Sequence, residues 1–184
     1  YQGGVRTLVA GGGERISGTG GPATAATIGD ARTLALADEG SLLLPFLEDE
    51  TIGRIALDGT FGVVAGTGTP DIADVPPGGV QATAHSFGRL FAVTSDHNGG
   101  YYVADSNRVL HVDPAGTLTL VAGGTWSTDP TIGLGGPATA SPLFEVRALA
   151  VAPDGSLVLS DSGQQAIKRI GLDGTISLVA GTGV

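Results

Sequence analysis

The sequence predicts an all-β fold: a β-propeller of about three four-stranded antiparallel blades, preceded by an extra N-terminal outer strand. The first observation is a phrase, Val-Ala-Gly, that returns four times, with its valines at positions 9, 64, 121 and 179. The intervals of 55, 57 and 58 residues indicate an internal repeat. The second observation is that each interval contains four short runs rich in Val, Ile and Leu, separated by glycine-containing turns. Repeated sheets of four short strands are typical of propeller blades.

The four strands recur in the same order in each repeat. Inner strands are expected from Arg32, Arg89 and Arg147, second strands from Ser41, Gly100 and Ser156, third strands from Ile52, Arg108 and Ala166, and fourth strands from Thr60, Thr117 and Thr175. Asp-Gly pairs at 58–59 and 173–174 separate third and fourth strands, and in a two-residue hairpin both turn residues have positive φ. A β-sandwich, the alternative all-β fold, would not repeat its sequence at this interval.

The chain of 184 residues is expected to form one partial propeller over residues 1–184. Its repeats span 12–66, 67–123 and 124–181, and residues 5–11 are expected to be an outer strand of a further blade. Three blades are too few to close a ring, because four is the usual minimum. We therefore expect a larger, six-bladed ring, completed by blades from flanking sequence or from another copy of the chain. We favour flanking sequence, since a side-by-side pair of copies would leave two outer strands surplus.

Charge and cysteine content narrow the classes of function. The formal net charge of −9 gives an acidic surface, which repels phosphate backbones and anionic lipids. We therefore expect no nucleic-acid partner and no membrane partner. The absence of cysteine excludes disulfides and thiolate chemistry, and the sequence has no Gly-x-Ser-x-Gly motif and no phosphate-binding loop.

Several stretches carry a resemblance to a known family. Gly-Gly-Pro-Ala-Thr-Ala occurs at 20–25 and 135–140, and second and third strands read YYVADSNRVLHV from 101 and LSDSGQQAIKRI from 159. These motifs resemble those of NHL-repeat β-propellers, above all the long-repeat bacterial form and the NHL propeller of teneurin-like surface proteins. Together with the repeat architecture, the resemblance implies a non-catalytic scaffold that binds a protein or small ligand through its loops and channel face. It also implies a secreted protein, in an extracellular, cell-surface or periplasmic location.

The repeated loop leads to one specific expectation. Its Gly-Gly lets the chain turn, and the proline that follows fixes φ. Each loop joins the outer strand of one blade to the inner strand of the next. We therefore expect Thr24 and Thr139 to occupy equivalent positions and to hydrogen-bond to the backbone of an adjacent blade.

Arginines at the start of the inner strands are candidate ligand-binding residues. Arg32, Arg89 and Arg147 stand at the same place in the three repeats, and we expect them to superpose from blade to blade. Because the first strand of a blade lines the channel, their guanidinium groups would form a ring that binds an anion. In the alternative, which we favour, each arginine stacks in a blade interface and pairs with a neighbouring blade's acid, such as Asp30 or Glu145.

Two aspartates are candidate metal ligands. Asp105 and Asp161 end second strands, where calcium-dependent lactonases of similar blade design carry their ligands. The alternative function is therefore a metal-dependent lactonase, hydrolase or lyase with its site in the central channel. Phe46 replaces this aspartate in the first repeat, which favours a role in folding as a turn cap over shared chemistry.

The remaining titratable candidates are an acidic loop and three histidines. The loop after the second strand of the first repeat contains Glu48, Asp49 and Glu50, which either bind calcium or form a solvated acidic turn. No histidine pair has metal-ligand spacing, so His85, His97 and His111 are expected to be ordinary hydrogen-bonded residues. We expect no cofactor, calcium being the one alternative, and a binding scaffold rather than an enzyme.

Overall fold

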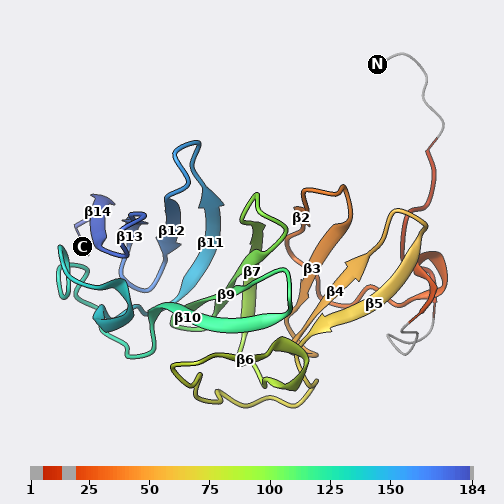
Figure 1. Cartoon of the computed structure of the whole chain (residues 1–184), viewed down its shortest axis with the longest axis horizontal. Coiled ribbons are helices and arrows are strands. Elements are labelled where there is room, and N and C mark those ends of the chain that lie inside the picture. The colour runs from red at the N-terminus through yellow and green to blue at the C-terminus, as the bar shows by residue number, and fades with distance from the viewer. Residues whose placement is uncertain (1–5, 14–19, 183–184) are drawn as a thin grey trace.

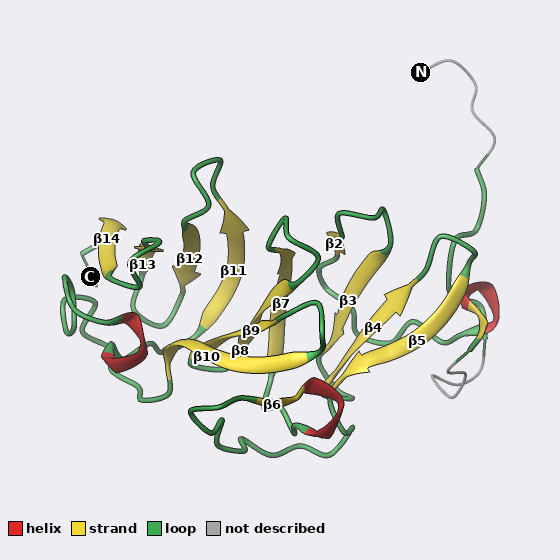
Figure 2. Cartoon of the chain, in the orientation of Figure 1, coloured by secondary structure: helices red, strands yellow, loops and turns green. Residues whose placement is uncertain are grey.

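The fold is a row of three antiparallel β-sheets that follow one another in chain order (Figure 1). The computed structural model describes residues 6–13 and 20–182. Within these ranges, helical structure is confined to three single 3-10 turns, Ala23–Ala25, Ala82–Ala84 and Ala138–Ala140 (Figure 2). None of the described helical segments has the length or the apolar character needed to cross a membrane. The predicted all-β fold is confirmed.

Each sheet is one blade, whose four main strands form an antiparallel meander. Blade 1 consists of β2 (Ala35–Leu36), β3 (Leu42–Phe46), β4 (Thr51–Ile55) and β5 (Thr60–Ala65). Blade 2 consists of β7 (Leu90–Ser95), β8 (Tyr101–Asp105), β9 (Arg108–Val112) and β10 (Thr117–Gly123). Blade 3 consists of β11 (Val146–Val151), β12 (Leu157–Asp161), β13 (Ala166–Ile170) and β14 (Ile176–Ala180). Two-residue strands, β1 (Gly21–Pro22) and β6 (Val80–Gln81), extend the outer edges of blades 1 and 2.

The Ala-Thr-Ala turns dock in the same way on all three blades. The first alanine of each turn donates its N–H to a hairpin glycine carbonyl: Ala23 to Gly59 (2.8 Å), Ala82 to Gly116 (2.9 Å) and Ala138 to Gly174 (2.9 Å). Thr24 and Thr139 therefore occupy equivalent positions, as expected. Both are exposed, and neither hydroxyl bonds to a described residue, so the expected hydrogen bonds to an adjacent blade are wrong. Backbone groups hold the loop instead.

The hairpins between third and fourth strands use a different turn from the predicted one. Gly59 has a φ of 81°, whereas Asp58 is not among the residues with positive φ. Gly59 donates its N–H to Ala56 O at 2.9 Å, and Ala56 donates to Thr60 O at 2.9 Å, the pattern of a longer loop that ends in a glycine bulge. Positive φ at both turn residues was therefore a wrong expectation. The Asp58 carboxylate stabilises the turn by accepting the Thr60 N–H at 2.9 Å.

The inner strand of blade 1 is shorter than predicted, since β2 has two residues. Leu47, just after β3, donates its N–H to Asp30 O at 3.5 Å. Because strand residues alternate, every second residue from Leu43 to Leu47 directs its backbone groups toward the inner strand. Pro45 is one of these residues and has no N–H to donate. The ladder between β2 and β3 therefore ends at the pair Ala35–Leu43.

Neighbouring blades bury an apolar layer between them. The alanine of the Val-Ala-Gly phrase, Ala65 in blade 1 and Ala122 in blade 2, is fully buried. Each packs in one cluster with the first alanine of the next blade's Ala-Thr-Ala turn. A backbone bond accompanies the first contact, from Gly66 N–H to Ala82 O at 2.9 Å. The same layers contain the fully buried side chains of Phe87 and Leu143, respectively.

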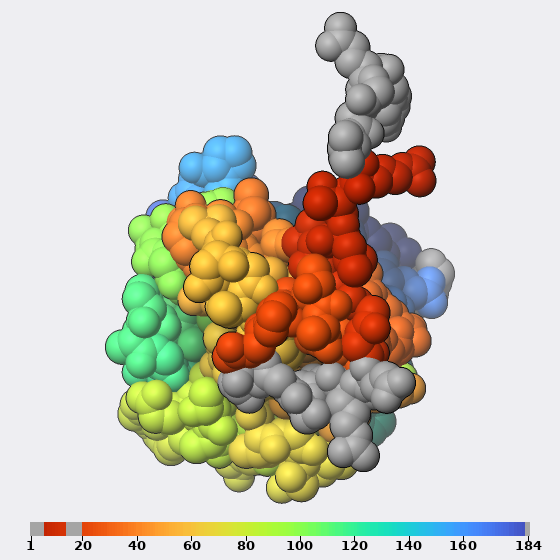
Figure 3. All heavy atoms as spheres, turned by 90° about the vertical axis from the view of Figure 1, so that its right-hand side faces the viewer, coloured from red at the N-terminus to blue at the C-terminus, as the bar shows by residue number. Residues whose placement is uncertain are grey.

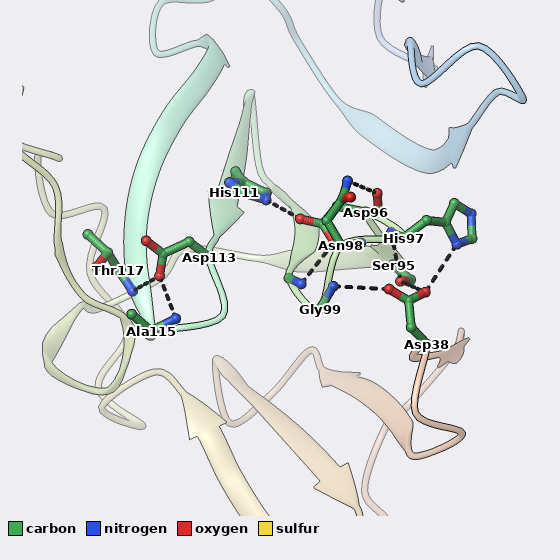
Figure 4. Close-up of polar contacts among 11 residues, drawn as sticks. Asp38, Ser95, Asp96, His97, Asn98, Gly99, His111, Asp113, Ala115 and Thr117 are labelled. Carbon is green, nitrogen blue, oxygen red and sulfur yellow. Dashed lines mark hydrogen bonds and ion pairs between the residues drawn. The ribbon is translucent and has the colours of Figure 1, made fainter.

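A second contact between blades 1 and 2 is polar. Asp38, in the turn between β2 and β3, accepts three hydrogen bonds from the end of β7 and the turn that follows it (Figure 4). The donors are Ser95 Oγ at 2.9 Å, His97 Nδ1 at 3.2 Å and Gly99 N at 3.0 Å. These bonds, that of Gly99 first, lower the pKa of Asp38. The contact fixes the turns of the two blades against each other.

The N-terminal segment lies against the outer face of blade 1. In Figure 3 the red atoms of residues 6–13 rest on the orange atoms of the loop that follows. Gly11 donates its N–H to Ala23 O at 3.0 Å, the counterpart of the bond between blades 1 and 2. Residues 6–11 thus lie at an outer blade edge without forming an assigned strand. Val5 falls outside the described residues, and a further blade for residues 5–11 stays a prediction.

Candidate functional site

A groove runs over blades 2 and 3 where their long loops meet. Its main cavity, of about 510 Å³, is lined by Ile72, Ser106, Asn107, Gly124, Trp126 and Phe144. An adjoining cavity of about 180 Å³ is lined by Arg89, Phe91, Ser106, Phe144 and Glu145. A third, of about 380 Å³, includes Ile72, Pro76, Pro77 and Asn107. Shared lining residues join the three cavities, which we call the loop groove.

One wall of the loop groove is apolar and open to solvent. Trp126, Ile72 and Phe144 keep 69%, 55% and 41% of their surface exposed. The Trp126 and Phe144 rings lie with centroids 5.9 Å apart. Gly163 makes room for this arrangement, because a side chain there would overlap the Phe144 ring. Exposed apolar side chains gathered at one cavity are typical of a binding surface.

A buried arginine holds the loop that carries Ile72. Arg108, 4% exposed, donates from Nη1 to Ala73 O at 2.7 Å. Its Nε and Nη2 donate to Asp105 Oδ2 at 2.9 and 2.7 Å, and Nη2 lies 3.3 Å from His85 Nε2. Burial, and then the charge of Arg108, lowers the pKa of His85 to about 4. The imidazole is therefore neutral near pH 7, and its Nε2 accepts from the guanidinium.

A buried glutamine holds the loop that carries Trp126. The fully buried Gln164 donates from Nε2 to three carbonyl oxygens of this loop. The acceptors are Ser127 at 2.7 Å, Pro142 at 3.2 Å and Asp129 at 3.3 Å. Because both groove loops are tied to buried polar side chains, the apolar wall is preorganised.

The two predicted aspartates lie inside the blades. Asp105 and Asp161 are 0% and 1% exposed. Asp161 accepts three backbone N–H bonds, from Phe144 at 2.8 Å, Glu145 at 3.0 Å and Gln164 at 3.1 Å. Asp105 binds Arg108, and burial raises its pKa although Arg108 opposes the shift. Both carboxylates are thus engaged by donors of the chain itself, and each supports a segment of the loop groove.

The three inner-strand arginines do not share one register. Where the inner strand pairs with the second strand, the pairing skips Phe91 in blade 2 and Arg147 in blade 3, so these two residues correspond. Arg89, two residues before Phe91, therefore corresponds to Glu145. Arg32 does match Arg147, since each lies four residues before the residue that pairs with the start of the second strand. The expected superposition is wrong for Arg89.

Charged pairs at these positions form within a blade. Arg32 Nη2 lies 2.9 Å from Asp30 Oδ2, and Arg147 Nη2 lies 2.6 Å from Glu145 Oε1. Pairing with the acid of a neighbouring blade is therefore not what the structure shows. Stacking between blades does occur, because the Arg147 guanidinium carbon lies 4.5 Å from the centre of the Phe91 ring. Anion binding by these arginines stays a prediction.

The acidic turn is less enclosed than the two aspartates. Glu48 is exposed, whereas Asp49 and Glu50 are half-buried in the turn between β3 and β4. Burial, and then the charge of Asp49, raises the pKa of Glu50. Across residues 6–13 and 20–182, no group of three or more His, Cys, Asp or Glu side chains is arranged to hold a metal ion. Calcium binding by these acids stays a prediction.

The histidines are hydrogen-bonded, as expected. His111 Nε2 lies 2.7 Å from Asp96 Oδ2, while His97 bonds to Asp38 and His85 to Arg108. Sequence reasoning missed the groove residues Trp126 and Gln164. The available signal was the single tryptophan of the chain, placed in a loop that departs from the repeat.

Comparisons with known proteins bear on the fold. No protein-family model matches the chain, and no match is found among curated proteins. A Bacteroides thetaiotaomicron protein of unknown function matches with a TM-score of 0.60 and 15% identity, over 76% of this chain and 33% of that one. A Xanthomonas campestris gluconolactonase matches with a TM-score of 0.56 and 16% identity, over 82% and 47%. An auxiliary nutrient binding protein from Bacteroides ovatus matches with a TM-score of 0.56 and 13% identity, over 82% and 36%.

The chain spans between a third and a half of these solved structures. At such low identity the likeness concerns the fold alone. Propellers are among the similar structures. The chain is therefore an all-β arc of three propeller blades, similar to part of larger propellers.

Proposed function

We propose that the chain is a non-catalytic binding module and that the loop groove is its ligand-binding face. The observation that supports this most is the exposed apolar wall of Trp126, Ile72 and Phe144 beside cavities large enough for a small ligand. The buried anchors Arg108 and Gln164 support it further, because a preorganised wall loses little conformational entropy on binding. The repeat supplies the rigid body, and its irregular loops supply recognition.

The family assignment and location belong to the same proposal. The Gly-Gly-Pro-Ala-Thr-Ala loops and the aspartates that cap second strands support an NHL-repeat propeller. With that assignment come a bacterial source, a secreted protein and an extracellular, cell-surface or periplasmic place of action. The acidic surface supports a protein or small-molecule ligand over nucleic acid or membrane.

The alternative is a calcium-dependent lactonase, hydrolase or lyase. A gluconolactonase is among the similar structures, but that likeness carries the fold and not the reaction. Asp105 and Asp161, the acids expected to bind the metal, are engaged by Arg108 and by backbone N–H groups. We therefore place binding ahead of catalysis. A calcium-dependent rise in melting temperature that Asp161→Asn abolishes would favour the enzyme instead.

The experiment uses Trp126, which as the single tryptophan reports on the loop groove alone. Titration with 4-phenylbutyrate, an apolar ring on a short chain, should give a saturable fluorescence change. Phe144→Ala should weaken binding about tenfold, because it removes apolar contact area. Leu172→Ala, which truncates a side chain that is 81% exposed and outside the groove, should not. A linear response, or equal affinity in both variants, would contradict the proposal.

A further inference from the structure

The loop groove ends where the repeat is broken. Blades 1 and 3 place an acid and, two residues later, an arginine before or at the start of the inner strand, and each such pair forms an ion pair. Blade 2 has Arg89 in the place of the acid and Phe91 in the place of the arginine. Blade 2 therefore lacks the acid–arginine pair that blades 1 and 3 share, and carries an arginine where they carry the acid. This departure from the repeat lies in the cavity that continues the apolar wall.

Arg89 has lost the partner that the repeat supplies elsewhere. It is exposed, and its guanidinium makes no hydrogen bond or ion pair with any residue in the described ranges. Its nearest defined contact is the Phe91 ring, 5.5 Å from the guanidinium carbon to the ring centre. Five N–H donors therefore face solvent at the end of a groove whose other wall is aromatic.

The acid in the same cavity forms its ion pair with another arginine. Glu145 Oε1 accepts from Arg147 Nη2 at 2.6 Å, and its Oε2 accepts from Ser162 Oγ at 2.9 Å. Two guanidinium groups thus face one carboxylate that is already engaged. Arg89 therefore has no ion-pair partner of its own among the described residues, in a chain whose net charge is −9.

We propose that the ligand of the loop groove is a small apolar carboxylate, with its apolar part against Trp126 and Phe144 and its carboxylate at Arg89. This inference rests on the proposed function and names its ligand class. Ser106 and Phe144 line both cavities, so one molecule reaches from the aromatic wall to the guanidinium. The planar guanidinium matches a carboxylate through two parallel hydrogen bonds. The two adjoining hollows, about 510 and 180 Å³, are open to solvent, so a small molecule would lie along the wall rather than inside a closed pocket.

Two probes of the same shape test the inference through Trp126 fluorescence. 4-Phenylbutyrate carries a carboxylate, and 4-phenylbutyramide carries a neutral amide in its place. The protein should bind the carboxylate about fivefold more tightly, the scale of one exposed ion pair. Added salt should reduce this preference and leave amide binding unchanged.

Substitutions assign the preference to one residue. Arg89→Gln should bind both probes equally, with the amide affinity unchanged, and Arg89→Lys should retain part of the preference. Arg6→Gln, the matched control, removes the same charge from an exposed residue of the N-terminal segment and should keep the full preference.

The outcomes separate the two proposals. Equal binding of the two probes by the unaltered protein, or an undiminished preference in Arg89→Gln, would overturn the carboxylate inference while the binding groove stands. Tighter binding of a hexapeptide ending in phenylalanine than of 4-phenylbutyrate would overturn the small-molecule class. No saturable response to either probe would overturn the groove and the inference together.

Discussion

Blades 2 and 3 present equivalent faces toward the C-terminal end of the row, and the described residues cover only one of them. Ala122 of blade 2 is fully buried and Val121 is half-buried, whereas Ala180 of blade 3 is exposed and Val179 keeps 57% of its surface in water. Local geometry is the same, since the glycines that follow both alanines have positive φ. The difference comes from the neighbour, because Ala138 and other blade 3 residues cover blade 2. The repeat thus determines the shape of a blade, and the next blade determines its burial.

The largest effect should come from placing a charge at equivalent positions of the two faces. Ala122→Asp puts a carboxylate in the closed interface without a partner and should cost about 3 kcal/mol or more of unfolding free energy. Ala180→Asp puts the same group on the open face and should change it by less than about 0.5 kcal/mol. Urea denaturation of both variants measures the difference. If Ala180→Asp is as destabilising as Ala122→Asp, the face of blade 3 is covered in solution and the comparison fails.

An intermediate effect should appear in acid, and it should arise in blade 2. Its buried aspartate binds Arg108 and, through it, His85, whereas Asp161 of blade 3 is held by backbone groups. The pKa of His85 is lowered from 6.5 to about 4 in the folded protein. The stabilisation by neutral His85 is therefore complete above pH 6.5 and is lost as the pH falls toward 4, by at most about 3 kcal/mol.

The measurement is the unfolding free energy between pH 7 and pH 4. His85→Gln retains an acceptor for Arg108 and removes the titrating group, so its stability should fall less steeply over this range. The exposed His97→Gln serves as the control and should retain the steep fall. Identical slopes for the unaltered protein and His85→Gln would show that the acid sensitivity has another origin.

The smallest effect concerns the Ala-Thr-Ala turn, by which one blade covers the preceding blade. Ala138 is buried in the layer between blades 2 and 3, while the adjacent Thr139 is exposed and lacks a hydrogen bond to any described residue. Thr139→Ala, and the equivalent Thr24→Ala, should change the unfolding free energy by less than about 0.5 kcal/mol. A loss of 1 kcal/mol or more in thermal or urea unfolding would mean that the hydroxyls contribute to docking after all.

The blades could be predicted from the sequence because the patterns that specify their strands and turns are local. The Val-Ala-Gly phrase and the Asp-Gly turns each act within a few residues, so spacing predicted the four main strands of each blade and their order. The turn type was missed, because a composition of Asp-Gly suits both hairpin classes and only the φ of Asp58 distinguishes them.

The binding face could not be predicted in the same way. Its wall combines Ile72 and Trp126 from two different loops, which only the packing of blades 2 and 3 brings together. Arg89 was misplaced because it was aligned with Arg147 by residue type, whereas it lies two residues before the bulge of its blade and Arg147 lies at the bulge itself. The position of such a bulge leaves no mark in residue type.

The cover that each Ala-Thr-Ala turn provides for the preceding blade also sets an order for folding during synthesis. Ala65 precedes Ala82, and Ala122 precedes Ala138, so every blade leaves the ribosome with one apolar face still bare. At about 5–20 residues per second, the turn that closes this face follows within a few seconds. If each blade folds as it is made, the bare face of blade 1 and that of blade 2 are each covered soon after synthesis, which shortens the time in which that face can meet another chain.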